Sequence, residues 1–155
     1  MKRYVIGFLF SGSGEKFLLI RKDHPEWQAG ALNGIGGKIE PGETPIESMI
    51  REFKEETGQD TTIEEWKDVL TLKFSYAEIE VFAAINDHVY LVAESTTSEA
   101  IERFSFMNLM NETVVNNLLP LLQLSYQKIF DNEGVAPVNW QQEQKEDDHG
   151  KNANQ

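Results

Sequence analysis

The chain has 155 residues, no cysteine and a formal net charge of −12. This length suits one domain with a sizeable core. The lack of cysteine excludes disulfides, thiolate metal sites and a cysteine nucleophile. An acidic surface repels a nucleic-acid backbone, which disfavours binding to a nucleic-acid polymer. No apolar run is long enough to span a bilayer, so we expect no membrane contact. The lack of cysteine is compatible with a reducing compartment, and we expect a cytoplasmic protein.

Strand and turn signals open the chain. Residues 4–10 and 17–21 are rich in apolar side chains and predict two strands, and Ser11–Gly14 predicts the turn of a hairpin between them. The first stretch lacks a full-length signal-peptide core and a small-residue cleavage site, so it predicts a buried strand. Residues 22–35 have the composition of a loop.

The clearest helix is predicted to begin at Thr44 and to run to about Thr57. Thr44 is a favoured N-cap, Pro45 suits the first helical position, and Glu47 completes a capping box. Gly58 supplies the left-handed residue that ends a helix. The apolar side chains recur at helical spacing and predict one buried face: Ile46, Met49, Ile50 and Phe53.

The second half of the chain predicts strands at 68–74, 77–85 and 88–93. Residues 101–109 fit either a strand or the start of a helix. A helix is expected over 112–129, in which Pro120 either bends the helix or marks a late start.

The composition changes toward the C-terminus. Residues 1–140 are expected to form the domain, and residues 141–155 form a polar tail that we expect to be disordered. Val135–Trp140 could dock on the domain.

Three glutamates gather on another face of the helix that begins at Thr44. At 100° per residue, Glu52, Glu55 and Glu56 fall within about 100° of one another. Like charges at this spacing destabilise a helix by a few tenths of a kcal/mol per pair, whereas clustered carboxylates suit Mg²⁺ or Mn²⁺. A bare Glu-x-x-Glu-Glu is more often a solvated acidic face, so the wider pattern decides.

The wider pattern runs from Gly37 to Gly58. Seven fixed residues and one hydrophobic residue, Phe53, occur at set spacing, and the fixed ones are Gly37, Glu43, Arg51, Glu52, Glu55, Glu56 and Gly58. At about 7% usage each, chance gives this set at roughly 10⁻⁸ per start position. The pattern resembles the Nudix box, Gly-x5-Glu-x7-Arg-Glu-hydrophobic-x-Glu-Glu-x-Gly-hydrophobic. The last position departs from the box, because it holds the polar Gln59.

The resemblance implies a metal site. Glu55 and Glu56 would be the principal ligands, and the carbonyl of Gly37 would join them. Glu52 would be a further ligand or the base that activates water. The implied cofactor is Mg²⁺, with Mn²⁺ as the alternative.

The resemblance also implies supporting roles. Glu43 would support the metal site, and Arg51 would hold a carboxylate through a bidentate salt bridge. Gly36 and Gly37 would let the backbone approach metal and phosphate closely. The family's fold is an α/β/α sandwich, with a central mixed β-sheet flanked by helices, and the predicted order of elements fits it.

The segment 32–40 resembles the MutT-like branch, which hydrolyses nucleoside triphosphates to a monophosphate and pyrophosphate. In its members that act on oxidised purines such as 8-oxo-dGTP, an Asn before the Gly-rich loop can read the base, and Asn33 is the candidate here. Asn33 could instead be a turn residue that leads into Gly34. Lys38 could reach a phosphate or be an exposed strand lysine.

Two aromatic residues are further candidates for substrate binding. Trp27 could stack on a base or cover the core. Tyr76 lies near the spacing of a Tyr found in dinucleoside-polyphosphate hydrolases, although a core or interface position explains a single Tyr equally. ADP-ribose hydrolases often have a Pro in this region, and no Pro occurs between Pro45 and Pro120.

An acidic residue from the second half of the chain could complete the metal site. Glu99 is the candidate for a further metal ligand or base, with Glu94 and Glu102 as competitors, and an exposed loop acid is the simpler reading.

Three functions follow from the sequence. The first is a metal-dependent nucleoside triphosphate pyrophosphohydrolase, and the second is a hydrolase of dinucleoside polyphosphates or nucleotide sugars. The third is a non-catalytic nucleotide-sensing module, which the intact Glu52, Glu55 and Glu56 argue against. The expected partner is a small nucleotide, and the chain could be a monomer or a homodimer.

Overall fold

The computed structural model describes residues 1–130 and shows an α/β sandwich. The predicted tail at 141–155, the domain end at residue 140 and the docking of Val135–Trp140 lie outside the described residues. The elements are β1 (Lys2–Phe10), β2 (Phe17–Arg21), β3 (Leu32–Asn33), β4 (Ile35–Lys38), α1 (Pro45–Thr57), β5 (Lys67–Lys73), β6 (Ala77–Ile85), α2 (Asp87–Val92), β7 (Ala100–Phe104) and α3 (Leu118–Phe130), with 3-10 turns at Glu26–Gln28 and Met107–Leu109.

Strand β1 is the centre of a mixed sheet. It pairs parallel with β6 from Lys2↔Ala77 to Phe10↔Ile85 and antiparallel with β4, and β6 pairs antiparallel with β5. The predicted hairpin is present, but β1 and β2 pair only at Phe10↔Phe17. Beyond that pair, β2 leaves β1 and forms antiparallel pairs with β3 and β7.

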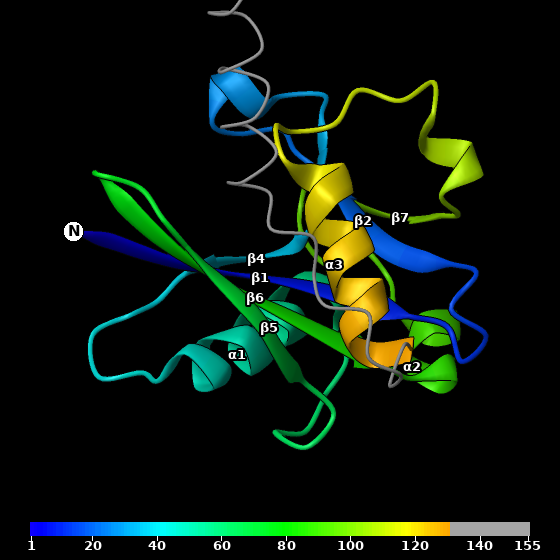
Figure 1. Ribbon diagram of the computed structural model, residues 1–155, viewed down its shortest axis with the longest axis horizontal. Helices are drawn as coiled ribbons and strands as arrows, with labels where there is room; N and C mark the ends of the chain where they lie inside the picture. The colour runs from blue at the N-terminus through cyan, green and yellow to red at the C-terminus, as the bar shows by residue number, and fades with distance from the viewer. Residues whose placement is uncertain (131–155) are drawn as a thin grey trace, which may run out of the picture.

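Beyond its exposed first residues, β1 is buried on both faces, because helices cover the sheet on either side (Figure 1). On one face, Val5 and Leu9 pack in a cluster with Met49 and Phe53 of α1. On the other face, Phe8 and Phe10 pack in a cluster with Leu118, Leu121 and Leu122 of α3. The alternating side chains of one strand therefore supply both cores, as expected for a strand with parallel pairing in the interior of a sheet.

Helix α1 begins and ends as its sequence predicts. The Thr44 side chain accepts a hydrogen bond from the Glu47 amide at 3.4 Å, and the Glu47 carboxylate accepts one from the Thr44 amide at 2.8 Å. Gly58 ends the helix with φ 74°. Met49 and Phe53 are fully buried, and Ile46 and Ile50 pack against them. The apolar face thus fixes the helix on the sheet and leaves its acidic face toward β4.

The predicted strand at 88–93 is wrong, because these residues lie in helix α2 and its C-cap. The Asn86 side chain accepts a hydrogen bond from the Val89 amide at 2.9 Å and caps the helix. Val89, Tyr90 and Ala93 are buried while Leu91 is exposed, which is the spacing of a helix face.

The predicted helix at 112–129 starts later, at Leu118. The Leu32 amide donates to the Thr113 carbonyl at 2.9 Å, and the Leu32 carbonyl accepts from the Val115 amide at 3.0 Å. These two hydrogen bonds hold residues 113–115 against β3. Asn117 then has φ 69°, a left-handed value that a right-handed helix cannot include. Pro120 therefore lies in the first turn, where its missing N–H costs little, so the late start is confirmed.

Two other regions are now assigned. The segment 22–35, expected to be a loop, contains the first 3-10 turn and β3 and ends at the first residue of β4. The ambiguous segment 101–109 begins in β7 and ends in the second 3-10 turn. Within residues 1–130, every helix falls short of the length and apolar character needed to cross a membrane.

Strands β4 and β1 approach each other closely at Gly36. A Cβ at this position would lie 2.0 Å from the Val5 carbonyl oxygen, and β1 cannot retreat because it is paired on both sides. Gly36→Ala should lower the free energy of unfolding by about 3 kcal/mol or more in urea titrations. Gly42→Ala is the control, because its Cβ meets nothing within 4 Å and only its φ of 86° opposes the change, at a cost of about 1 kcal/mol. Equal losses in the two variants would contradict this packing.

Candidate active site

Strand β4 and helix α1 bring Gly37 and Glu52 together. A Cβ on Gly37 would lie 2.5 Å from the carboxyl carbon of Glu52, so only glycine lets this carboxylate come so near the backbone. Burial raises the pKa of Glu52, and a hydrogen bond from Arg51 opposes this shift. Two members of the sequence pattern, one on the strand and one on the helix, are therefore in contact.

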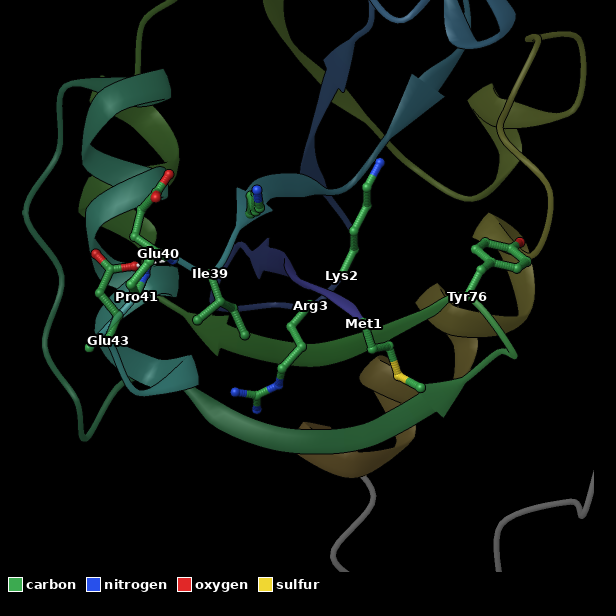
Figure 2. A pocket seen from close by; sticks show the side chains of 10 residues that line it. Met1, Lys2, Arg3, Ile39, Glu40, Pro41, Glu43 and Tyr76 are labelled. Carbon is green, nitrogen blue, oxygen red and sulfur yellow. Dashed lines mark hydrogen bonds between the residues drawn. The ribbon is translucent and has the colours of Figure 1, made fainter.

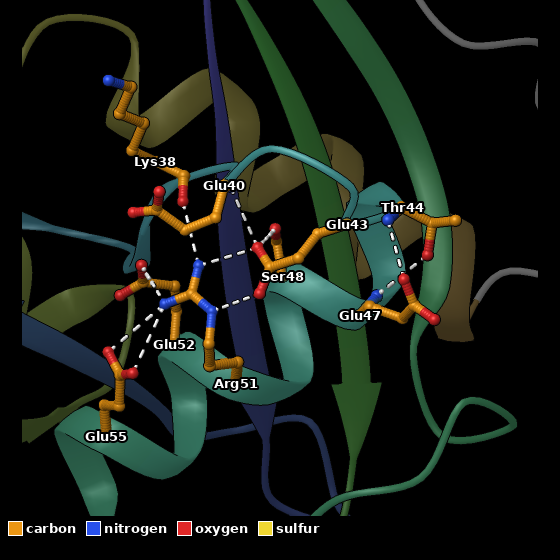
Figure 3. Close-up of polar contacts among 9 residues, drawn as sticks. All are labelled: Lys38, Glu40, Glu43, Thr44, Glu47, Ser48, Arg51, Glu52 and Glu55. Atoms are coloured by element: carbon orange, nitrogen blue, oxygen red, sulfur yellow. Dashed lines mark hydrogen bonds and ion pairs between the residues drawn. The ribbon is translucent and has the colours of Figure 1, made fainter.

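Arg51 joins the acidic residues into one network (Figure 3). Its Nε and Nη2 donate to the two carboxylate oxygens of Glu43 at 2.5 and 2.9 Å. Its Nη1 donates to Glu52 at 2.8 Å and lies 3.3 Å from Glu55, while Nη2 also donates to the Lys38 carbonyl at 3.0 Å. The planar guanidinium suits this set, because its donors point along fixed directions in one plane.

Glu43 is the most firmly held acid of the network. Besides Arg51, it accepts hydrogen bonds from the Ser48 hydroxyl and from the Glu40 amide, the latter at 3.0 Å. Hydrogen bonds from Arg51, and next from Ser48, lower the pKa of Glu43 to about 2. Glu43 therefore stays ionised and keeps the guanidinium in place beside Glu52 and Glu55.

Glu56 has the opposite environment. Its side chain is only 8% exposed, and its Oε2 is buried without a hydrogen-bond partner. Burial raises its pKa to about 8; Lys22 opposes this, while Glu52 and Glu99 add to it. A buried carboxylate oxygen without a donor is costly. A divalent cation among these carboxylates would offset that cost, so the donor set fits Mg²⁺ or Mn²⁺.

Glu94, Glu99 and Glu102, the three candidates from the second half of the chain, have different environments in the structure. Glu99 is 5% exposed and accepts hydrogen bonds from Lys22 Nζ at 2.9 Å and from the Asp23 amide at 2.8 Å, so it is not an exposed loop acid. Glu102 instead pairs with Arg21 at 2.7 Å, and Glu94 is exposed. Of the three, Glu99 alone is among the charges that shift the pKa of Glu56.

Several residues around the carboxylates were missed in the sequence. Lys22 follows β2 directly and contacts Glu99, while single ligand atoms of Asp23, His24 and Glu99 lie within 4.8 Å of one another. Ser48 is fully buried on α1 and donates to Glu43. The one signal for Ser48 is a polar residue beside the apolar face of the helix. Nothing in the sequence shows that residues 22–24 meet residue 99.

The four candidates for substrate binding fall into two groups. Asn33 donates to Gln28 at 3.2 Å, the residue that follows Trp27 in the chain. Trp27 is 76% exposed and therefore does not cover the core. Lys38 and Tyr76 line a different place, an open depression of about 630 Å³ that also includes Lys2, Arg3, Ile39 and Pro41 (Figure 2). Tyr76 is 72% exposed and stacks on Phe74, so it is not a core residue.

A profile of the NUDIX domain matches residues 1–136 of the chain. The chain belongs to the Nudix family. The resemblance inferred from residues 37–58 is thus confirmed, and the protein is a Nudix hydrolase, a pyrophosphohydrolase. Enzymes of this family generally use a divalent metal ion on small nucleotide substrates. The sequence has no matching relative among curated proteins.

Solved Nudix structures share the fold. A MutT protein from work on Aliivibrio salmonicida and Vibrio cholerae superposes with a TM-score of 0.68 at 20% identity, covering 81% of this chain and 98% of that one. The NUDIX domain of Shewanella oneidensis NrtR, solved with ADP ribose, gives 0.67 at 16% identity, covering 81% and 86%. A Clostridium perfringens NUDIX hydrolase gives 0.64 at 20% identity, covering 83% and 97%. These similarities confirm the predicted α/β/α sandwich.

The burial of Glu56 predicts how stability depends on pH in the metal-free protein. Because its folded pKa is raised from the ordinary value near 4.3 to about 8, the unfolded chain binds fewer protons between these values. This contribution is therefore fully present below about pH 4 and is lost as the pH rises toward 8, with a slope of at most about 1.4 kcal/mol per pH unit. Glu43 has a lowered pKa, so its contribution is nearly constant above about pH 5, where its carboxyl is ionised in both states.

Urea unfolding in the presence of a chelator, at pH values from about 5 to 8, measures this slope. Glu56→Gln should reduce this slope, because the amide does not titrate, and the remainder comes from Glu52, whose pKa burial also raises. Glu94→Gln, at an exposed position, should leave the slope unchanged. A slope in the Glu56→Gln protein equal to that of the unaltered protein would show that Glu56 ionises normally.

Proposed function

We propose that the chain hydrolyses a nucleoside triphosphate to the monophosphate and pyrophosphate with the help of Mg²⁺, for which Mn²⁺ can substitute. The observation that carries the proposal is Glu56, whose buried oxygen lacks a partner beside two further glutamates of the same helix. Glu55, Glu56 and the Gly37 carbonyl would hold the cation, and Glu99 would join them from the loop before β7. When bound, the cation supplies positive charge to the phosphate oxygens and activates the attacking water.

The protein's own residues have distinct parts in this proposal. Glu52 lies against Gly37, where the backbone can approach a phosphate, and would accept the proton of the attacking water. Arg51 would fix Glu52 and Glu55 while Glu43 anchors the guanidinium from behind. Lys38 extends from the end of β4 and would neutralise a phosphate of the substrate.

The proposed substrate class rests on Asn33. Its side-chain oxygen accepts from the Gly34 amide at 2.7 Å and its nitrogen donates to Gln28, so the amide is fixed at the end of β3. A fixed amide with both a donor and an acceptor can recognise a base edge. This position, together with the resemblance of the segment 32–40 to the MutT-like branch, favours a purine triphosphate, including an oxidised one such as 8-oxo-dGTP.

A second candidate function has its own observation. The depression beside the β4–α1 loop is lined by Lys2, Arg3, Lys38 and Tyr76, together with two acids, Glu40 and Glu43. Three cations near an exposed ring could hold a second nucleoside or a sugar joined through the diphosphate. This arrangement favours a dinucleoside polyphosphate or a nucleotide sugar, and the Shewanella oneidensis neighbour was solved with ADP ribose.

Replacing the central carboxylate tests the reaction itself. Glu56→Gln should lower turnover by about 100- to 1,000-fold or more, because it removes a ligand charge while keeping the shape of the side chain. Pyrophosphate release with Mg²⁺ measures turnover, and circular dichroism checks folding. Glu94→Gln should keep full activity. If the unaltered protein and Glu56→Gln bind a nucleotide equally and neither hydrolyses it, the chain is a nucleotide sensor and not an enzyme.

Two alanine variants distinguish the substrates. A panel of canonical and oxidised nucleoside triphosphates, dinucleoside polyphosphates, ADP-ribose and nucleotide sugars is tested with Mg²⁺, and the products are identified. Asn33→Ala should lower kcat/KM for the preferred triphosphate by about 10- to 100-fold, because the loss of a fixed hydrogen-bonding group weakens base recognition. Tyr76→Ala should leave this value unchanged. The reverse pattern, with cleavage of dinucleoside polyphosphates and no triphosphate activity, would establish the second candidate function.

A further inference from the structure

The last turn of α1 is bonded to the loop that precedes β7. A helix leaves its last four carbonyls without partners inside the helix, and in α1 these belong to residues 54–57. The Gly58 amide donates to the first of them, that of Lys54, at 2.8 Å. The other three accept from the segment 94–96. This loop therefore completes the end of the helix that carries the metal-binding carboxylates.

Thr96 makes two of these three hydrogen bonds. Its hydroxyl donates to the Glu55 carbonyl, and its amide donates to the Glu56 carbonyl at 3.3 Å. The Glu94 amide donates to the Thr57 carbonyl at 3.2 Å. The Thr96 methyl lies 3.3 Å from the position that a Cβ on Gly58 would take. The loop and the end of α1 are therefore closely packed as well as joined by hydrogen bonds.

The same loop carries the buried acid that faces the helix. Three residues after Thr96, the Glu99 amide donates to the Thr97 hydroxyl at 3.2 Å, and the Glu99 side chain is bonded to Lys22 and to the Asp23 amide. At its other end, the loop begins at Ala93, whose carbonyl accepts from Arg103 at 2.8 Å. The loop is thus fixed at both ends and touches α1 in the middle.

We propose that Thr96 is a positioning residue for metal binding, because it ties the backbone of Glu55 and Glu56 to the loop that bears Glu99. This inference rests on the proposed function, in which these three acids hold the cation. Thr96 itself contacts neither cation nor substrate. It sets the separation between acids that come from α1 and from the loop, and a metal site tolerates displacements of only about 0.5 Å.

The expected effect is a loss of metal affinity that exceeds any loss of stability. Thr96→Val keeps the shape and the amide but removes the hydroxyl bond to the Glu55 carbonyl. Residues that orient metal ligands typically change metal affinity by about 10- to 100-fold, and we expect about 10-fold here. Titration of the purified protein with Mn²⁺ without nucleotide, followed by electron paramagnetic resonance, measures this affinity independently of catalysis.

Two further substitutions make the comparison specific. Thr96→Ser keeps the hydroxyl and should restore the Mn²⁺ affinity to within about 2-fold of the unaltered protein. Thr71→Val is the matched control, because the Thr71 hydroxyl also makes one hydrogen bond, to Glu80 at 2.8 Å on β5 and β6. It should leave the Mn²⁺ affinity unchanged. Thermal unfolding of all variants shows whether affinity and stability change separately.

Unchanged Mn²⁺ affinity in Thr96→Val would overturn the proposal and leave Thr96 a purely structural residue. If the valine variant does not fold, Thr96→Ala removes the same hydroxyl without the added methyl, and its affinity decides. Failure of the proposed function gives a different result. In that case the unaltered protein binds Mn²⁺ but hydrolyses no nucleotide of the panel, and the affinities of the Thr96 variants still decide whether this loop positions the metal ligands.

Discussion

The guanidinium of Arg51 is the interaction on which the rest of the site depends. Gathering carboxylates on one helix is unfavourable, because like charges repel and each must be solvated or paired. Arg51 offsets this for Glu43, Glu52 and Glu55 at once. Glu56 is outside its reach and is left with an unpartnered oxygen. The negative charge of the carboxylates is thus balanced by Arg51 on the exposed side of the site. Around Glu56, at its centre, positive charge is lacking, and a cation would be bound there.

Helix α1 and the two faces of its surface could be predicted from the sequence, because every determinant is local. The capping box at Thr44, the left-handed Gly58 and the angular separation of apolar and acidic faces depend on residues within one helix length. A bidentate salt bridge from Arg51 to a carboxylate could likewise be expected from the box, although the box does not name Glu43 as its partner. The tight approach of Gly37 to Glu52 was not predicted, because it depends on how β4 packs against α1.

One wrong prediction overlooked a local capping signal, and the other differences depend on contacts between distant segments. Residues 88–93 have the apolar character of a strand, yet the Asn86 cap and burial at helical spacing make them a helix. Asn117 interrupts the expected last helix, because residues 113–115 are bonded to Leu32. Glu99 could be named as a candidate, but its burial could not be predicted, since its partners lie more than 70 positions earlier. The sequence of one chain does not show that Glu99 lies close to Lys22 and Asp23.

The parallel pairing of β1 with β6 has a consequence for the order in which the molecule is assembled. The first pair, Lys2↔Ala77, joins residues 75 positions apart. The parallel partner of β1 is therefore synthesised long after β2 and β4, its antiparallel partners, and closing so long a loop carries a large entropic cost. During synthesis, α1 emerges before β6, and the loop with Glu99 emerges last of the three. The nascent chain therefore carries the acidic helix for some time without the strand and loop that complete its site.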